Sequence, residues 1–301
     1  MRVLIIGADT PVGLSLADTL AQRGREFVSL PRADCRWKSE RQAKKSLRRA
    51  ACDISVDTRI QSAADGGIQV HDIDIARSTW LARASQVLKL PYLHLSCARV
   101  FAGSAGRAYR EEDHPDGQST ISDLLCQAES TVRDSCEQHL ILRMGPVFAP
   151  AGINVITHML RQLNEGEQLH LSREQQGCPI ATEDAAWVIS GMLDQISCGL
   201  QAWGIYHYCS PDITNCFEFA EVLLAAASQY RDLDAEAVQL VPTEAAITVR
   251  NLDCNKIRNT FAIKQQPWRA SVADHVKQYY NGTVTEEKRV DESNRHRDAS
   301  A

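Results

Sequence analysis

The sequence lacks any long apolar run. No stretch of its 301 residues approaches the roughly eighteen consecutive apolar residues that a membrane-spanning helix needs. The apolar run at the start, Val3 to Ile6, is also too short for the core of a signal peptide. These absences argue against a membrane protein and favour a cytoplasmic location.

The ten cysteines lack any regular arrangement. They are scattered singly along the chain and include no C-x-x-C pair. Zinc sites and disulfide frameworks of small secreted proteins both need closely and regularly spaced cysteines. The pattern therefore favours buried thiols in a reducing compartment, and it gives no reason to expect a bound metal.

The chain also lacks an excess of positive charge. Its formal net charge is −5 at pH 7, so non-specific binding to nucleic acid is not expected. The most basic stretch, residues 41–49 (RQAKKSLRR), has helical spacing. A solvated helix face explains this stretch better than a phosphate-binding patch does.

The first half of the chain contains apolar runs that alternate with amphipathic segments at short intervals. Strands are predicted at residues 3–6, 27–30, 52–56, 92–96 and 139–143, and helices at residues 11–23, 41–49, 75–88 and 119–136. Such an alternation is typical of an α/β protein with a doubly wound parallel sheet. We assign this sheet to a Rossmann-type dinucleotide-binding domain over residues 1–150.

Beyond residue 150 the pattern changes. Helices are predicted near residues 154–164, 182–196 and 217–229, and short strands near residues 168–171, 205–208 and 238–241. This order predicts a smaller mixed α/β lobe over residues 151–280, part of which packs back onto the sheet. Residues 281–301 are almost all polar or charged, without periodicity, and are predicted to be a disordered tail.

Residues 7–13 (GADTPVG) lie between the first predicted strand and the first predicted helix, where a Rossmann phosphate-binding loop belongs. The middle glycine of such a loop lets the backbone approach a pyrophosphate, and here that position is Thr10. The start of the helix would still attract an anion. The loop is therefore either a weakened dinucleotide site or a purely structural turn. Its candidate cofactor-binding residues are Gly7, Thr10, Pro11, Val12 and Gly13.

The end of the second predicted strand indicates the type of cofactor. An acidic residue there would bind the ribose hydroxyls of NAD, but the chain has Arg32. An arginine can pair with the 2′-phosphate of NADP, so NADP is favoured over NAD. The alternative is an exposed arginine that binds no ligand.

Several segments, taken in their order and spacing, share a pattern with one known family. They are residues 94–103 (HLSCARVFAG), 109–113 (YREED), 140–143 (LILR), 176–179 (QGCP), 252–256 (LDCNK) and 267–268 (PW). On these segments the chain resembles the dTDP-4-dehydrorhamnose reductase family of extended short-chain dehydrogenases, from about residue 1 to about residue 280. The resemblance implies a Rossmann-type sheet followed by a smaller C-terminal lobe that binds a nucleotide sugar.

The resemblance also implies a chemistry whose groups are missing from this chain. In the family a nicotinamide transfers hydride to a keto sugar, a tyrosine supplies the proton, and a lysine lowers the pKa of that tyrosine and holds the ribose. A threonine or serine binds the carbonyl. Alignment of the flanking segments puts Cys97 at the hydroxyl position, Ile121 at the tyrosine and Leu125 at the lysine. An isoleucine cannot donate a proton and a leucine cannot carry a charge.

The nicotinamide neighbourhood differs from the family as well. The asparagine that ends the preceding strand in the family becomes Asp57, which is a candidate cofactor-binding position, and the small residues after it become Thr58 and Arg59. Together with the loss of the catalytic groups, these changes imply that binding of NADP or NAD is weak or lost.

Local substitutes for the missing proton donor are available but poor. Ser119 and Ser122 flank the tyrosine position, yet a serine hydroxyl is a far weaker acid than a phenol. Tyr109 lies on a predicted loop, and as a substitute it would have to swing into the site. Cys97 is either a nucleophile or a buried inert thiol, and the inert thiol is favoured because no base is evident beside it.

By resemblance, three residues of the second lobe line or support the nucleotide-sugar cleft: Asn154, Gln176 and Asp184. Asn154 and Asp184 can instead cap helices or face solvent, and Gln176 can be a plain turn residue. His94, on an apolar strand, is expected to be a core histidine with its hydrogen bonds satisfied. Four tryptophans are expected in the core: Trp80, Trp187, Trp203 and Trp268.

Two functions, from different classes, fit this pattern. The favoured one is a non-catalytic family member that binds NAD(P), another nucleotide or a nucleotide sugar and acts as a regulator or scaffold, with a protein partner or as a homo-oligomer. The alternative is an active NAD(P)H-dependent reductase or epimerase of a nucleotide sugar with relocated catalytic groups. A structural protein that binds no small molecule is a weaker third hypothesis.

Overall fold

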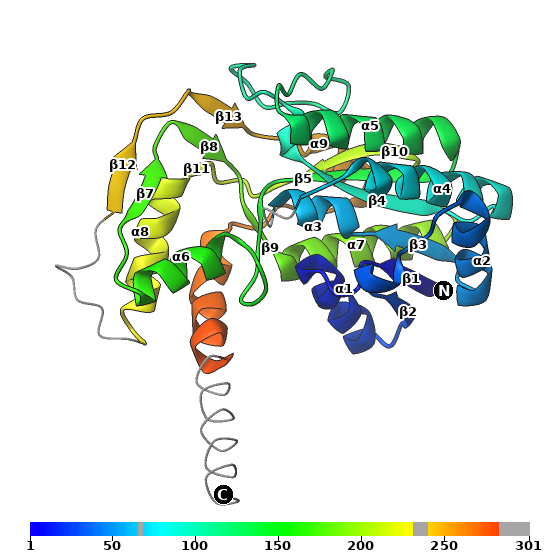
Figure 1. Ribbon diagram of the computed structural model, residues 1–301, viewed down its shortest axis with the longest axis horizontal. Helices are drawn as coiled ribbons and strands as arrows, with labels where there is room; N and C mark the ends of the chain where they lie inside the picture. Colours follow the sequence, from blue (N-terminus) through cyan, green and yellow to red (C-terminus); the bar gives the residue numbers. More distant parts are fainter. Residues whose placement is uncertain (66–68, 231–239, 283–301) are drawn as a thin grey trace, which may run out of the picture.

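A six-stranded parallel sheet forms the centre of the computed structural model, which describes residues 1–65, 69–230 and 240–282 (Figure 1). The strand order is β2-β1-β3-β4-β5-β10. The strands are β1 (Arg2–Ile6), β2 (Glu26–Leu30), β3 (Ile54–Asp57), β4 (Tyr92–Cys97), β5 (His139–Met144) and β10 (Gly204–Tyr208). The predicted doubly wound parallel sheet is confirmed.

The inner strands are apolar on both sides because helices cover both faces of the sheet. Val3 and Ile5 belong to one buried cluster and Leu4 and Ile6 to another, as the alternation of side chains along a strand requires. In Figure 1, α1 (Pro11–Gln22) and α7 (Thr182–Ser197) lie on one side of the sheet, and α4 (Asp72–Leu88) and α5 (Thr120–Ser135) lie on the other. Helix α2 (Glu40–Ala50) packs beside α4.

The second lobe lies beside the sheet and has its own core (Figure 1). Phe148, Leu160, Phe219 and Trp268 are buried together there. Its helices are α6 (Val155–Asn164), α8 (Cys216–Ala227) and a helix over residues 269–282. Its strands are β6 (Val147–Phe148), β7 (Leu169–Ser172), β8 (Gln175–Gly177), β9 (Ile180–Ala181), β11 (Thr214–Asn215), β12 (Leu240–Thr243) and β13 (Thr248–Arg250).

The chain passes between the sheet and the lobe more than once. After β5 it enters the lobe, but α7 packs against α1 and β10 pairs with β5 at the edge of the sheet. Helix α9 (Asn255–Phe261) then contacts β10. The surface between sheet and lobe is therefore built from segments far apart in the sequence.

Several local expectations change in the structure. Helix α3 (Arg59–Asp65), α9 and the short strands β6, β8, β9, β11 and β13 were not expected from periodicity. The two helices have seven residues each and the strands two or three, which are too few to show a pattern. The expected strand near residues 238–241 is found as β12, and residues 231–239 lie outside the described chain. Of the expected tail, residues 281 and 282 end a helix, and residues 283–301 are not among those described.

Two expectations about aromatic side chains are wrong. Trp187 is 63% exposed on α7, with the guanidinium of Arg23 at 5.3 Å from its ring centroid. His94 is in the core, as expected, but neither ring nitrogen has a hydrogen-bond partner among the described residues. Burial lowers the pKa of His94, so the ring is neutral. Within the described ranges, no helix is both long and apolar enough to cross a bilayer.

Candidate nucleotide site and interlobe pocket

The sheet topology locates the first candidate site. The strand order reverses at β1, which has β2 on one side and β3 on the other. In open α/β sheets, ligands bind outside the carboxyl ends of the strands at such a reversal. The loop that begins at Gly7 follows β1 there, and Asp57 ends β3 beside it, paired in register with Ile6.

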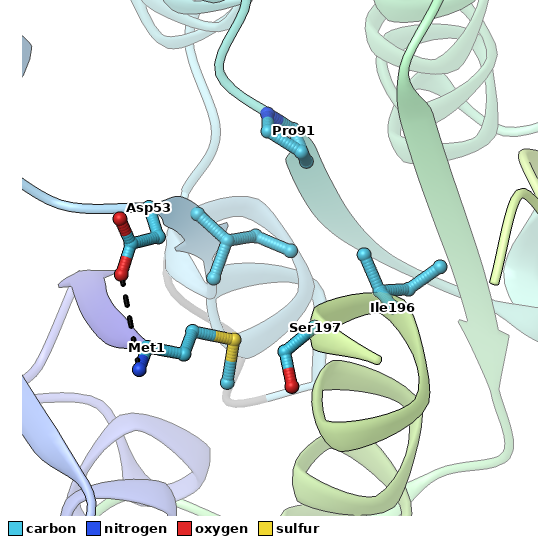
Figure 2. Close-up of a pocket in the computed structure, with 6 residues that line it drawn as sticks. Met1, Asp53, Pro91, Ile196 and Ser197 are labelled. Atoms are coloured by element: carbon cyan, nitrogen blue, oxygen red, sulfur yellow. Dashed lines mark ion pairs between the residues drawn. The ribbon is translucent and has the colours of Figure 1, made fainter. Parts of the chain in front are cut away.

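A cavity of about 350 Å³ at the opposite end of the sheet is not a candidate (Figure 2). Met1, Asp53, Pro91, Ile196 and Ser197 line it, and the amino nitrogen of Met1 lies 3.9 Å from a carboxylate oxygen of Asp53. These residues stand at the amino ends of β1, β3 and β4 and at the last turn of α7. The peptide dipoles and loops that bind ligands in such folds are at the other edge.

The glycines of the phosphate loop are required by its geometry. Gly7 has φ +84°, and a side chain there would have its Cβ 2.7 Å from Oγ1 of Thr58. A Cβ on Gly13 would lie 2.4 Å from the carbonyl oxygen of Gly7. Both residues therefore allow the tight turn and the close approach of α1 to β1 that the sequence predicts.

Thr10 is turned inward and is fully buried. Its Oγ1 caps α1 by accepting from the amide of Gly13 at 3.0 Å. The hydroxyl of Thr58 donates to the carbonyl of Gly7 at 2.8 Å, so at the 2.7 Å contact between the two threonines Thr10 is the donor. Thr10 thus ties the loop after β1 to the end of β3.

This arrangement leaves few donors for an anion at the start of α1. Pro11 has no N–H, the amide of Gly13 bonds to Thr10 Oγ1, and the amide of Leu14 bonds to the carbonyl of Thr10. In the described part of the chain, Val12 has the one first-turn amide without a partner. Helix N-termini bind phosphate through several such amides, so this one is a weak anion site.

The end of β3 carries a buried ion pair. Asp57 is fully buried and Arg59 is 5% exposed. The guanidinium of Arg59 donates to both carboxylate oxygens, from Nε at 2.9 Å and from Nη2 at 2.7 Å, and the hydroxyl of Tyr92 donates at 2.7 Å. Burial opposes ionisation of Asp57, but Arg59 outweighs it and holds the pKa of Asp57 below its usual value. Both groups are therefore charged.

Arg59 also forms one wall of a cavity of about 500 Å³, which we call the arginine pocket. Its charged lining is Asp9, Arg32, Arg36, Arg59, Asp74 and Arg77. Arg32 pairs with Asp9 at 3.4 Å and Arg77 with Asp74 at 3.1 Å, whereas Arg36 is exposed and has no ion pair within the described residues. The pocket lies at the carboxyl ends of β2 and β3, where the sequence predicts the cofactor phosphate.

A second cavity, of about 450 Å³, lies between the sheet and the lobe, and we call it the interlobe pocket. It is bounded by the carboxyl end of β4, the start of α5, and strands β8, β11 and β13. Its lining includes Cys97, Arg99, Ser119, Ser122, Gln176 and Arg250. Burial and the neighbouring Arg99 lower the pKa of Arg250.

The two aliphatic residues at the expected catalytic positions belong to the core. Leu125 is fully buried, and Ile121, one turn earlier on α5, is partly buried and packs against the same cluster. Neither lines the interlobe pocket. This face of α5, at Ile121 and Leu125, is therefore hydrophobic.

The hydroxyls nearby are committed to the protein itself. Ser122 donates to the carbonyl of Arg99 at 2.7 Å, and Ser119 contacts Ser122 Oγ at 2.7 Å as the N-cap of α5. Tyr109 is 3% exposed, and its hydroxyl accepts from the amides of Gly103 and Ser104 at 2.9 and 3.0 Å. The two serines are thus bonded within the protein, and burial separates the Tyr109 hydroxyl from a substrate in this conformation.

The three residues expected to support a nucleotide-sugar cleft do not all lie at one site in the structure. Gln176 lines the interlobe pocket, and Cys97 lies opposite it at the end of β4. Asn154 instead caps α6, accepting from the amide of Ile156 at 3.0 Å, and Asp184 accepts the hydroxyl of Tyr208 at 2.8 Å. Burial raises the pKa of Asp184 to about 6.

Sequence reasoning missed four arginines. Arg36 and Arg77 join Arg32 in the arginine pocket, and Arg99 and Arg250 join Gln176 in the interlobe pocket. The proximity of Arg36 to Arg32 along the chain was a usable signal. No signal of that kind existed for Arg250, which reaches the pocket through the pairing of β13 with β8.

A family model described as the RmlD substrate binding domain matches residues 1–281. The chain belongs to this family. A dTDP-4-dehydrorhamnose reductase of Sinorhizobium fredii is 26% identical over 285 residues, which cover 90% of this chain and 95% of the relative. The spore coat polysaccharide biosynthesis protein SpsK of Bacillus subtilis is 25% identical over 74% of this chain and 78% of its own length.

Solved structures agree on the fold. A dTDP-4-dehydrorhamnose reductase of Clostridium acetobutylicum superposes with a TM-score of 0.77 at 17% identity, covering 92% of this chain and 99% of its own. That of Bacillus anthracis, solved in complex with NADP, gives 0.73 at 20% identity, with 91% and 96% covered. The recognised family and the extended short-chain dehydrogenase fold are therefore confirmed.

Proposed function

We propose that this member of the RmlD substrate-binding-domain family binds a nucleotide and a nucleotide sugar without reducing the sugar, and acts as a regulator or scaffold. The proposal depends on one observation above all. The resemblance puts Ile121 and Leu125 at the positions of the proton donor and its supporting lysine, and both side chains pack against the core. General acid catalysis contributes about 10² to 10⁴ in rate, so its loss leaves at most trace turnover.

The fit of an NADP-type cofactor differs between its two ends. A bound nicotinamide supplies hydride to a substrate carbonyl. The adenosine end fits this chain, because the glycine turn at Gly7 is kept and Arg32 and Arg36 line a pocket suited to a 2′-phosphate. The nicotinamide end does not fit, because Leu125 cannot hold a ribose as a lysine does. We therefore derive no hydride step, and we expect NADP to be favoured over NAD.

The interlobe pocket is our candidate for the nucleotide sugar. Arg99 and Arg250 bring two guanidinium groups to one side of it, and arginines bind diphosphates well. Gln176 adds an amide that can hydrogen-bond to a base or a sugar. These contacts recognise a ligand and include no strong acid.

An active reductase or epimerase with relocated catalytic groups is the second candidate. The open interlobe pocket and the thiol of Cys97 at the end of β4 favour it. The committed hydroxyls of Ser119, Ser122 and Tyr109 weaken it. We propose further that the protein acts with a partner protein or as a homo-oligomer. We also propose a cytoplasmic location, because a reducing compartment suits ten free cysteines.

The test is a turnover assay paired with a binding assay. The purified full chain is mixed with NADPH and a panel of dTDP-4-keto sugars, and NADPH absorbance is followed. In parallel, equilibrium dialysis measures binding of dTDP and NADPH. We expect binding without oxidation of NADPH. Sustained oxidation that depends on the sugar would overturn the proposal in favour of the enzyme, and absence of all binding would favour a purely structural role.

A further inference from the structure

We propose that Arg59 anchors a phosphate group in the arginine pocket, and that the cleft accepts a nucleoside bisphosphate about as well as a full dinucleotide. The inference rests on the proposed nucleotide binding and adds which chemical part of the ligand is recognised. On this proposal the arginine pocket binds the phosphorylated adenosine end of the ligand, and the rest of a dinucleotide adds little to the affinity.

The first observation is an unsatisfied donor. Arg59 is 5% exposed, and its Nε and Nη2 are bound to Asp57, but Nη1 has no hydrogen-bond partner among the described residues. A buried charged donor without a partner is costly, and an anion that reached it by a small shift of the neighbouring side chains would satisfy it. The ion pair with Asp57 fixes the orientation of the guanidinium before any ligand arrives.

The second observation is the charge around that donor. Arg32, Arg36 and Arg77 line the same cavity, and among the described residues two carboxylates, Asp9 and Asp74, accompany them on its wall. Asp57 is already paired with Arg59, and the exposed Arg36 has no ion pair with any residue that the structure describes. Planar guanidinium groups match the oxygens of a phosphate, and several of them around one cavity favour a dianion over a single charge.

The third observation explains why contacts to a pyrophosphate would add little to the affinity. With Pro11 lacking an N–H and the amide of Gly13 bound to Thr10, the start of α1 retains the amide of Val12 as its available first-turn donor within the described chain. The side chain of Arg59 also covers the loop: its Cγ lies 2.9 Å from where a Cβ on Gly7 would stand. The phosphate loop (residues 7–13) therefore offers few hydrogen-bond donors and is partly covered, whereas the arginine pocket beside it is a cavity of about 500 Å³.

Isothermal titration of the full chain tests the ligand class with four probes: adenosine 2′,5′-bisphosphate, AMP, NADP⁺ and inorganic phosphate. We expect the bisphosphate to bind within about threefold of NADP⁺ and at least about tenfold more tightly than AMP, the difference expected for a charge-assisted contact. NADP⁺ binding more than tenfold tighter than the bisphosphate, or AMP equal to it, would overturn the proposal.

The double variant Asp57→Asn with Arg59→Gln tests the anchor, because it removes both charges together and leaves no buried carboxylate unpaired. We expect the double variant to bind the bisphosphate about tenfold or more weakly than the native chain does. Arg36→Gln, at an exposed position, should weaken it by a smaller factor and keeps the test valid if the double variant does not fold. Arg48→Gln removes an exposed charge of α2 outside the pocket and should change nothing.

The possible results separate this inference from the proposed function. If the double variant binds NADP⁺ more tightly than the native chain, Arg59 blocks the cleft and the inference is wrong. If dTDP binds, no NADPH is oxidised, and the bisphosphate does not bind, the inference alone fails. If the bisphosphate binds as expected and NADPH is oxidised, the proposed function fails while the inference stands.

Discussion

The arginine pocket and the interlobe pocket lie at the same edge of one sheet but have different chemistry. The first is built around charge: Arg59 and Asp57 are buried and paired, and three more arginines surround them. The second carries Arg99, Arg250 and Gln176 on its wall, while Leu125 and Ile121, at the positions expected for an ammonium and an acid, pack in the core and do not line it. Our proposal, that this cleft keeps the groups that recognise a phosphate and lacks those that move a proton, requires the two sets to be independent, and they stand on different strands and helices.

The largest expected effect tests whether the expected catalytic positions on α5 lack only their polar groups. Ile121→Tyr combined with Leu125→Lys should raise NADPH oxidation in the presence of a dTDP-4-keto sugar by about 10² to 10⁴ over the native chain, the usual contribution of a general acid. The control is Ile121→Phe with Leu125→Met, which adds similar bulk without an acid or a charge. Equal rates in both variants would mean that the nicotinamide end is defective for another reason.

The next effect concerns stability at the charged end. Arg59→Met leaves Asp57 as a buried, unpaired carboxylate and should destabilise the fold by about 3–5 kcal/mol, measured by urea unfolding. Asp57→Asn in the same chain should recover most of that free energy of unfolding, because it removes the unpaired carboxylate. A loss under 1 kcal/mol for Arg59→Met would show that the pair is not buried as described.

Tyr109→Phe distinguishes a structural tyrosine from a relocated catalytic one. The phenol oxygen accepts two backbone amides, so its removal should cost about 1–2 kcal/mol in unfolding free energy. Ligand binding and any residual turnover should stay unchanged. Turnover that is present in the native chain and abolished in the variant would identify Tyr109 as the acid.

The smallest effect is a pH dependence at Asp184. Its folded pKa of about 6 lies above that of an unfolded aspartate, so the folded state binds the extra proton between those two values. The native chain should therefore gain about 1 kcal/mol relative to Asp184→Asn as pH falls from about 7 to about 5. Urea unfolding at several pH values measures this, and dTDP binding serves as a control that should not change. A weaker affinity for dTDP would place Asp184 in the ligand site.

The sheet was predictable because its strands are long apolar runs with helices between them. Runs such as residues 3–6 and 92–96 are buried on both sides and carry the signal in every residue. Strands β8, β11 and β13 are two or three residues long, so only their tertiary pairing defines them. The walls of the interlobe pocket come from these strands, which is why Arg250 was missed.

Residue roles were harder to predict than positions. The sequence predicts that Thr10 adds bulk to the phosphate loop, but not that its hydroxyl is directed to Thr58, a residue 48 positions away. It identifies Arg59 as a departure from a small residue, but not its pairing with Asp57 or its place in the arginine pocket. Both outcomes depend on β3 lying beside β1, which the sheet order decides.

The position of Trp37 has a practical consequence. Its buried indole lies 5.8 Å from the guanidinium of Arg59, measured to the ring centroid. An anion drawn to that guanidinium alters the electric field at the ring, so the fluorescence of Trp37 should change as the pocket fills. The other four tryptophans emit in the same band, so Trp37→Phe identifies the part of the signal that comes from Trp37. The intrinsic fluorescence of Trp37 should therefore report ligand binding in the arginine pocket without an attached dye.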